Sequence, residues 1–342
     1  MVTSEAARVV RADKGAVLVL PGHQTPGAAD PTEAVRVVLD RDGLVATTGE
    51  ERLAPTVGDW LDVVDDHAVL IHERRTALVR DTAGATSHVQ ALAANVDVVV
   101  IVEHLDPDPD LGRIERMLTL AWRSGARPVV VLTKADLVPD PEGMAADVAG
   151  VALAVDVHTV SVWEDRGLDA VRALLAPGVT LVVVGPSGAG KSSLVNALAG
   201  REVMDTGGQR NDGRGRHTTT FRQLVPLTGG AMLIDTPGIR GVGVVADVDA
   251  LDTTFSDVAA LADRCRFADC HHTGDAGCAI AAALDSGELS ERRFDSWRRL
   301  AKEAAYQARR SDARLAAEER DRWKRVTKDY QRGLRGPGQP RH

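Results

Sequence analysis

The first quarter of the chain alternates short apolar stretches with turns rich in Gly, Pro and Asp. The stretches predict short strands, at residues 7–12, 16–20, 34–40, 59–64, 68–73 and 76–81. Strands this short and this closely spaced are typical of small barrels. We therefore expect an N-terminal all-β domain resembling an OB barrel over residues 1–85, although a β-sandwich fits the same spacing. By composition, residues 21–33 are expected to form a surface loop.

From Asn95 onward the pattern changes to apolar strands that alternate with helical segments. Strands are expected at 95–103, 127–137, 153–162, 180–185 and 231–238, and helices at 113–125, 167–176 and 191–200. This alternation predicts a parallel sheet with crossover helices. We assign residues 86–250 to this central α/β domain. Beyond them no strand is predicted, and residues 251–342 are expected to form a helical domain.

Composition narrows the class of protein. The 342 residues suffice for two or three domains, and 44% hydrophobic with 26% charged residues is typical of globular chains. The apolar runs are far shorter than the roughly 20 residues of a membrane span, and the N-terminus lacks a secretory pattern. We expect a cytoplasmic protein without membrane contact.

Charge is unevenly distributed along the chain. The net charge is −8, but residues 291–342 hold 16 Lys and Arg against 8 Asp and Glu. A basic tail on an acidic body favours a polyanionic partner for Arg292 through Arg335, while a solvated helix of mixed charge explains the same composition.

The strongest motif is Gly185-x4-Gly190-Lys191-Ser192, which follows an apolar strand and precedes an amphipathic helix. In this context it is a phosphate-binding loop: backbone N–H groups surround the β-phosphate, Lys191 reaches the β and γ oxygens, and Ser192 ligates Mg²⁺. The residues predicted to hold the phosphates are Gly185, Pro186, Ser187, Gly188, Ala189, Gly190, Lys191, Ser192 and Ser193.

A second phosphate motif follows at the end of the next apolar strand. Asp235 is placed to hold Mg²⁺, and the Gly238 amide to contact the γ-phosphate. Between the two motifs lies a Gly-rich polar stretch that ends in Thr218, Thr219 and Thr220, a composition suited to a switch loop. We expect Thr218 and Thr219 to contact GTP and one of the threonines, assigned as Thr219, to join Ser192 and Asp235 around Mg²⁺.

The sequence Thr133-Lys134-Ala135-Asp136 after an apolar strand resembles the NKxD motif of GTPases. The resemblance implies that Asp136 accepts hydrogen bonds from guanine N1 and N2, that Lys134 packs over the base, and that the first residue ties this loop to the phosphate loop. Thr133 replaces the usual Asn, a change expected to loosen the site or lower affinity. Ser161 resembles the loop whose backbone amide contacts guanine O6.

The guanine motif precedes the phosphate loop here, which is the reverse of the ordinary GTPase order. This permuted order, with GPSGAGKSSLVN, GRHTTT and DTPGIRG, resembles the ribosome small-subunit-dependent GTPase A (RsgA or YjeQ) family. Residues 73–84 and 90–97 resemble that family's junction between barrel and GTPase. The resemblance implies a monomeric bacterial assembly factor that hydrolyses GTP and whose partners are the small ribosomal subunit and its rRNA.

All three cysteines fall in one short segment. Cys265, Cys270, His272 and Cys278 form a Cys₃His set, which suits one closed tetrahedral Zn²⁺ site. Three cysteines cannot all pair as disulfides, and a reducing cytoplasm disfavours such pairs. His271 competes as a ligand, but the spacing in the resembling family matches His272.

Where many GTPases carry a Gln after the second phosphate motif, this chain has Ile239. An aliphatic side chain cannot orient the attacking water, so slow intrinsic hydrolysis is expected. The resemblance implies His217 as the catalytic residue, assisted by Lys191, and the small subunit as activator; His217 as a plain solvated loop residue is the competing interpretation. Two other functions stay open: a GTP-binding RNA chaperone with negligible turnover, and a permuted GTPase of large-subunit assembly, although such proteins lack the barrel and the cysteine cluster.

Overall fold

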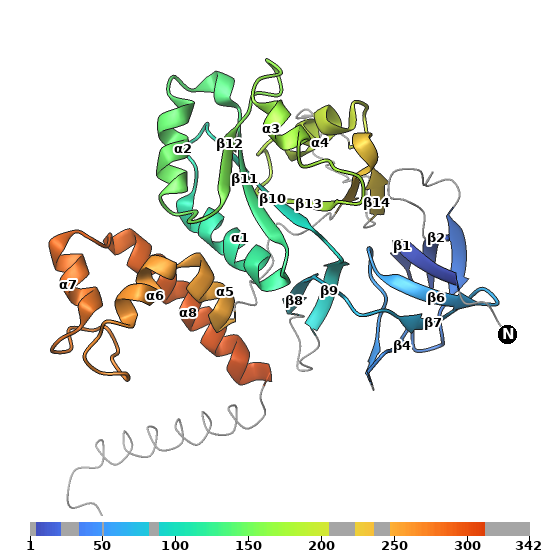
Figure 1. The fold of residues 1–342 in the computed structure, drawn as a ribbon, viewed down its shortest axis with the longest axis horizontal. Coiled ribbons are helices and arrows are strands. Elements are labelled where there is room, and N and C mark those ends of the chain that lie inside the picture. The colour runs from blue at the N-terminus through green and yellow to red at the C-terminus, as the bar shows by residue number, and fades with distance from the viewer. Residues whose placement is uncertain are drawn as a thin grey trace, which may run out of the picture.

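The structure is a computed structural model and describes residues 5–21, 34–49, 51–81, 89–204, 223–235 and 247–311. It is built from three parts, a β-barrel, a central α/β part and a helical lobe, with the α/β part between the other two (Figure 1). This confirms the expected multidomain fold class. The boundaries at residues 85 and 250 stay predictions.

The N-terminal part is a closed five-stranded barrel of the OB type. Its strands are β1 (Glu5–Asp13), β2 (Ala16–Pro21), β3 (Val35–Val38), β6 (Trp60–Val64) and β7 (His67–Ile71). They pair in the order β1-β2-β3-β7-β6 and back to β1, with β3 and β7 parallel and the other pairs antiparallel. Alternate apolar residues such as Val9, Val37 and Leu61 fill the interior.

Two features of this region differ from the sequence prediction. The hairpin of β4 (Val45–Thr47) and β5 (Arg52–Leu53) lies beside β7 and was not expected. The sixth expected strand, β8 (Ala77–Asp81), pairs with β9 (Val89–Ala94) in a separate hairpin and is no part of the barrel. The prediction differs from the structure because the spacing of strands in the sequence does not reveal which strands pair with each other.

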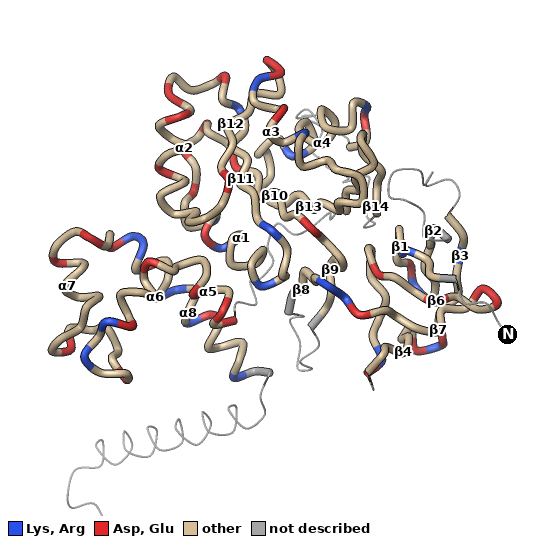
Figure 2. Tube along the Cα trace, in the orientation of Figure 1, with Lys and Arg blue, Asp and Glu red and all other residues tan. Residues whose placement is uncertain are grey.

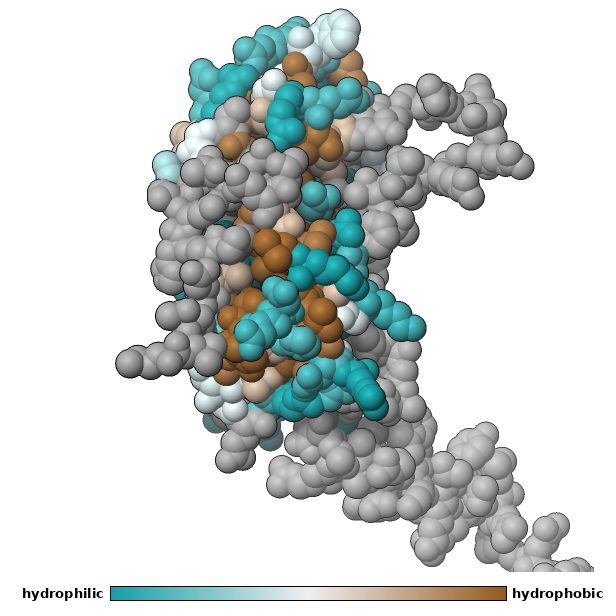
Figure 3. Space-filling view, turned by 90° about the vertical axis from the view of Figure 1, so that its right-hand side faces the viewer, coloured by the Kyte–Doolittle hydropathy of each residue, from teal (hydrophilic) through white to brown (hydrophobic). Residues whose placement is uncertain are grey.

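The face seen from the barrel side shows an apolar area bordered by polar side chains (Figure 3). The exposed apolar side chains of the barrel are Val35, Val38 and Val69. The one aromatic residue, Trp60, lies under the guanidinium of Arg8, whose Cζ is 5.5 Å from the ring centroid. The described barrel therefore presents no aromatic platform for stacking nucleic-acid bases.

The central sheet has the order β12-β11-β10-β13-β15-β14. Five strands are parallel and β14 is antiparallel: β10 (Val98–His104), β11 (Arg127–Thr133), β12 (Asp156–Thr159), β13 (Thr180–Val184), β15 (Met232–Asp235) and the edge strand β14 (Gln223–Pro226). The sequence prediction missed β14. The helices are α1 (Leu111–Ser124), α2 (Pro141–Ala149), α3 (Leu168–Arg172) and α4 (Lys191–Ala199), with single 3₁₀ turns at Ala135–Leu137 and Thr228–Gly230.

Alternate residues of the buried strands supply two cores, one on each face of the sheet. Val99 and Ile101 of β10 pack with residues of α1 and α2, whereas Val100 and Val102 pack with residues of α3 and α4. The parallel strands thus read as continuous apolar runs because both faces are covered. Their carboxyl ends meet at one edge, where the predicted motifs lie.

The barrel and the central sheet are joined by backbone pairing. Arg11 of β1 is opposite Gln223 of β14, so the two parts form one thirteen-stranded sheet. Beside this junction Arg8 donates through Nη2 to Thr180 Oγ1 of β13 at 2.7 Å. Burial lowers the pKa of Arg8 to about 10, so it remains charged at neutral pH. The barrel is therefore an extension of the sheet that carries the phosphate loop.

The helical lobe comprises α5 (Val248–Thr254), α6 (Ser256–Ala262), α7 (Ala279–Ser286) and α8 (Glu291–Ser311). The described residues beyond β15 contain no strand, as predicted. Phe255 and Leu300 belong to the core of the lobe. No described helix has both the length and the apolar composition of a membrane span.

The helical lobe contacts α1 through ion pairs to the buried carboxylate of Glu115. Glu115 of α1 is fully buried and accepts hydrogen bonds from Arg292 at 3.0 and 3.1 Å and from Arg293 at 2.8 Å. Arg293 also binds Asp257 and lies 4.3 Å from the Phe255 ring centroid. Arg292 and Arg293 belong to the tail that was expected to bind RNA, but they make contacts within the protein instead. Residues of both charge signs lie along α8 (Figure 2). Residues 312–335 of that tail lie outside the described part.

Candidate nucleotide site and metal centre

The phosphate loop lies between β13 and α4 at the carboxyl edge of the sheet. Gly185 has a φ of +143°, and a Cβ there would lie 2.0 Å from the carbonyl oxygen of Val102 in β10, so only glycine fits. Lys191 donates through Nζ to the carbonyl of Gly185 at 3.0 Å and to that of Pro186. The lysine side chain thus lies over the loop. The first backbone amides of α4 lie at the end of the loop, where the phosphates of the nucleotide are expected.

Thr133 joins the base-recognition loop to the phosphate loop. Its hydroxyl donates to the carbonyl of Ala189 at 2.7 Å, and the carbonyl of Glu103 lies at 3.2 Å as a second acceptor. The residue is 2% exposed, and a Cβ on Gly190 would meet Thr133 Oγ1 at 3.4 Å. The link that the family pattern assigns to Asn is therefore made here by the threonine hydroxyl; the effect of Thr133 on affinity stays a prediction.

Asp136 is oriented by a buried serine. The Ser161 hydroxyl donates to Asp136 Oδ1 at 2.6 Å. The Ser161 amide, which the resemblance assigned to guanine O6, donates instead to the carbonyl of Arg166 at 3.0 Å. Lys134, which adopts a φ of +61°, donates through Nζ to the carbonyl of Asp106 at 3.2 Å. Hence Thr133, Lys134, Asp136 and Ser161 gather beside the phosphate loop.

Sequence reasoning missed a buried ion pair under this site. Glu103, at the end of β10, is fully buried and accepts hydrogen bonds from Arg113 of α1 at 2.7 and 3.0 Å. The hydrogen bond to Glu103 raises the pKa of Arg113. Because the carbonyl of Glu103 also faces Thr133, this pair fixes the strand end on which the base loop rests. The sequence did hold a signal for this pair, because Glu103 is a charged residue that directly follows the apolar run of residues 98–102.

The γ-phosphate side of the site is only partly described. Asp235 ends β15, the neighbour of β13, but its side chain lies outside the described part. His217, Thr218, Thr219, Thr220, Gly238 and Ile239 lie outside it as well. Asn196 of α4 accepts hydrogen bonds from the amides of Val203 and Met204 at 2.8 Å and so holds the chain just ahead of this segment. The roles of these residues remain predictions.

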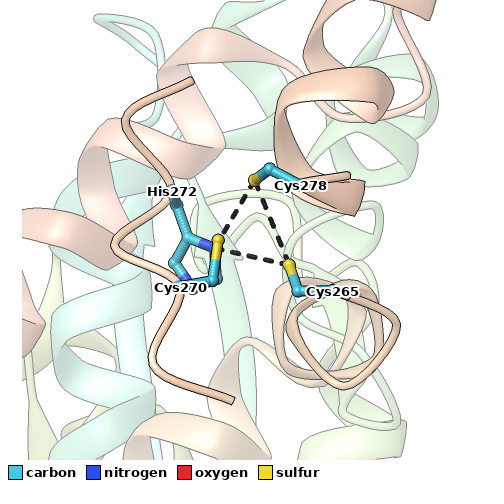
Figure 4. Close-up of side chains that lie close together, drawn as sticks. All are labelled: Cys265, Cys270, His272 and Cys278. Atoms are coloured by element: carbon cyan, nitrogen blue, oxygen red, sulfur yellow. Dashed lines mark hydrogen bonds between the residues drawn. The ribbon is translucent and has the colours of Figure 1, made fainter. Parts of the chain in front are cut away.

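Three thiols and one imidazole converge in the helical lobe (Figure 4). Cys265 follows α6, Cys278 caps α7, and Cys270 and His272 come from the loop between them. Their ligand atoms all lie within 4.8 Å of one another. His271 is not a member of this group; its backbone amide donates to Asp275 at 3.1 Å.

The spacing of these atoms fits a tetrahedral ion. Cys265 Sγ lies 4.0 Å from Cys278 Sγ, and His272 Nδ1 lies 3.6 and 3.7 Å from those two sulfurs. A tetrahedron with metal–sulfur bonds of about 2.3 Å has sulfur–sulfur edges of about 3.8 Å. The cluster can therefore hold a metal ion with little movement. The His272 ring meets Trp297 of α8 edge-on with centroids 5.9 Å apart, so the loop rests on that helix.

A strand, phosphate loop and helix preceded in sequence by a guanine motif define a circularly permuted P-loop GTPase. The chain belongs to the RsgA GTPase family, whose family model matches residues 71–245. It is 47% identical over 328 residues to the small ribosomal subunit biogenesis GTPase RsgA of Streptomyces avermitilis, covering 94% of this chain and 85% of that one. The protein of that name from Streptomyces coelicolor is 45% identical over 326 residues, covering 93% and 85%.

Solved structures show the same fold. YjeQ from Thermotoga maritima matches with a TM-score of 0.62 and 22% identity over 88% of this chain and 99% of that one. YloQ, described as a circularly permuted GTPase, matches with a TM-score of 0.62 and 22% identity over 88% of this chain and 95% of that one. These matches support the three-part architecture predicted from the sequence, and membership of the RsgA GTPase family makes the chain a GTPase.

Proposed function

We propose that this GTPase acts in the biogenesis of the small ribosomal subunit and that the subunit accelerates its hydrolysis of GTP. The observation that supports the GTPase part of the proposal is the joined site, in which Thr133 bonds the guanine loop to the phosphate loop. Two relatives at 45% and 47% identity bear names that state small-subunit biogenesis. A cytoplasmic monomer that binds rRNA is part of the same proposal.

In this function Asp136, held by Ser161, accepts the hydrogen bonds of the guanine edge. Lys191 neutralises charge on the β and γ phosphates, in the bound state and in the transition state alike. Ser192, Thr219 and Asp235 would hold Mg²⁺, which withdraws negative charge from the phosphates when bound. The backbone amides of the phosphate loop orient the nucleotide, and the Gly238 amide would contact its γ-phosphate.

His217 is proposed to orient the attacking water, because Ile239 has no group that can do so. The loop that carries His217 would take its active arrangement on the subunit. Intrinsic turnover is then slow, and the subunit acts as activator.

The Cys₃His cluster is proposed to hold one structural Zn²⁺ per chain. Three thiolates and an imidazole are the preferred ligands of zinc in closed sites, and the spacing of the sulfurs fits its radius. Zinc would fix the loop between α6 and α7 against α8.

The test is GTP turnover measured alone, with purified small subunits and with large subunits. We expect slow turnover alone, strong stimulation by small subunits only, and His217→Ala without stimulation but with unchanged GTP binding. Equal turnover under all three conditions would favour the second candidate, a GTP-binding RNA chaperone, for which Ile239 is the supporting observation. Stimulation by large subunits alone would instead place the protein in large-subunit assembly.

A further inference from the structure

Trp163 is the most exposed large hydrophobic side chain of the described residues, at 91%. It lies in the loop of residues 161–166, which follows β12 and leads to α3 (Figure 1). An indole held in water leaves a large apolar surface without a partner, and such surfaces commonly mark binding sites. Leu137, which directly follows Asp136, is 56% exposed. Leu137 thus lies next to Asp136 in sequence, and Trp163 lies two residues after Ser161.

The loop that presents Trp163 is rigid. Ser161 and Arg166 exchange two backbone hydrogen bonds of 3.0 Å, and the Ser161 hydroxyl accepts a third from the Glu164 amide at 3.1 Å. Gly167 then packs so closely that a Cβ would lie 2.1 Å from the carbonyl of Thr159. These contacts hold the backbone from which Trp163 projects.

The same loop is anchored to the carboxylate that would recognise guanine. Ser161 Oγ lies 2.6 Å from Asp136 Oδ1. Two residues span at most about 7 Å of chain, so the Cα atoms of Ser161 and Trp163 lie within about that distance of each other. A base bonded through its edge to Asp136 has two open faces, and the stem of Lys134 can cover only one of them.

The charges of the loop argue against a phosphate backbone as the partner of Trp163. Glu164 pairs with Arg166 at 3.6 Å, and Asp165 pairs with Arg172 at 2.8 Å. The loop therefore carries no uncompensated cation to attract phosphate, and it presents one aromatic face. A purine ring is the partner that such a face suits.

We propose that Trp163 stacks on the guanine base of the bound nucleotide, on the face that Lys134 leaves uncovered. The inference rests on the proposed guanine site at Asp136. Trp163 would then add affinity for GDP and GTP alike, because both nucleotides present the same base.

The test combines GDP affinity with the accessibility of the indole. Trp163→Ala is expected to raise the Kd of GDP about tenfold, whereas Trp163→Phe, which keeps an aromatic face, stays within about threefold. Saturating GDP should shield one indole of the wild-type chain from acrylamide quenching and shield none in Trp163→Phe. Unchanged GDP affinity in Trp163→Ala, or unchanged quenching in the wild type, overturns the proposal.

Two further variants separate this inference from the function on which it rests. Phe267, in the loop between α6 and α7, is another exposed aromatic side chain, at 49%. Phe267→Ala should leave GDP affinity unchanged. Asp136→Asn should lose the preference for GTP over ATP. If Asp136→Asn loses this preference and Trp163→Ala leaves GDP affinity unchanged, only the stacking inference fails. If Asp136→Asn keeps the preference, the proposed guanine site itself is wrong. Shielding of Trp163 by small subunits but not by GDP would also overturn the stacking.

Discussion

A single hydroxyl connects the two halves of the nucleotide site. Thr133 is buried between the carbonyls of Ala189 and Glu103, and the shorter of its two contacts is the one to Ala189. The threonine thus makes the contact between the two loops with a smaller side chain than the usual Asn. The loop that would read the base and the loop that would hold the phosphates consequently have a fixed spacing.

Thr133→Val should weaken GDP and GTP binding about tenfold, because it leaves the buried carbonyl of Ala189 without a donor. Thr133→Ser keeps the hydroxyl and should bind within about threefold of the wild type. Isothermal titration of the three proteins decides the matter. Equal affinities for the Val and Ser variants would show that the hydrogen bond has no part in nucleotide binding.

The sequence sufficed to predict residues whose role depends on a local motif. Thr133, Lys134, Asp136 and the phosphate loop lie together because parallel strands end at one edge of a sheet. It did not predict that Ser161 holds Asp136 through its side chain, nor the pair of Glu103 and Arg113. Those contacts join positions far apart in the chain, and no local spacing encodes them.

Among the elements, α8 contacts α1, the helices α5 and α6, and the loop between α6 and α7. Arg293 is 3% exposed and binds Glu115 and Asp257, while Trp297 packs on His272. Composition predicted a helix here, and the arginines of this helix were expected to contact RNA. Their inward use became visible only with the structure, because charge alone does not reveal the side on which a helix packs.

Arg293→Ala should lower the free energy of unfolding by about 3–5 kcal/mol, since it leaves the buried Glu115 with one fewer cation. Arg298→Ala, in an exposed pair with Asp295, is the matched control and should cost no more than about 1 kcal/mol. Urea denaturation of both variants provides the measurement. A similar loss in the two would contradict the role of the buried network.

Removal of the metal should unfold the loop between α6 and α7 while nucleotide binding survives, because small sites of this type fold only with their ion. The emission of Trp297, which packs on His272, should report the loss. Metal analysis of untagged protein should find one zinc per chain, and Cys270→Ser should mimic chelation. Protein that is free of zinc yet fully folded would refute the site.

At the scale of the whole molecule, the tail beyond α8 is expected to contact rRNA phosphates. Removal of residues 312–342 should flatten the salt dependence of small-subunit binding, since phosphate contacts release counterions. The cut belongs after residue 311, because α8 supplies Leu300 to the core of the lobe and Arg293 to α1. Co-sedimentation at several salt concentrations measures the slope, and parallel slopes would mark the tail as a solvated helix.

The pairing of β1 with β14 also bears on how the protein is made. The second half of β1 emerges from the ribosome early, but its partner around Gln223 is synthesised only after most of the chain. At about 5–20 residues per second, this edge waits on the order of ten seconds or more for its hydrogen bonds. An unpaired strand edge invites pairing with other chains. The order of the strands in the chain therefore delays completion of the joined sheet, although the barrel itself closes within residues 5–71.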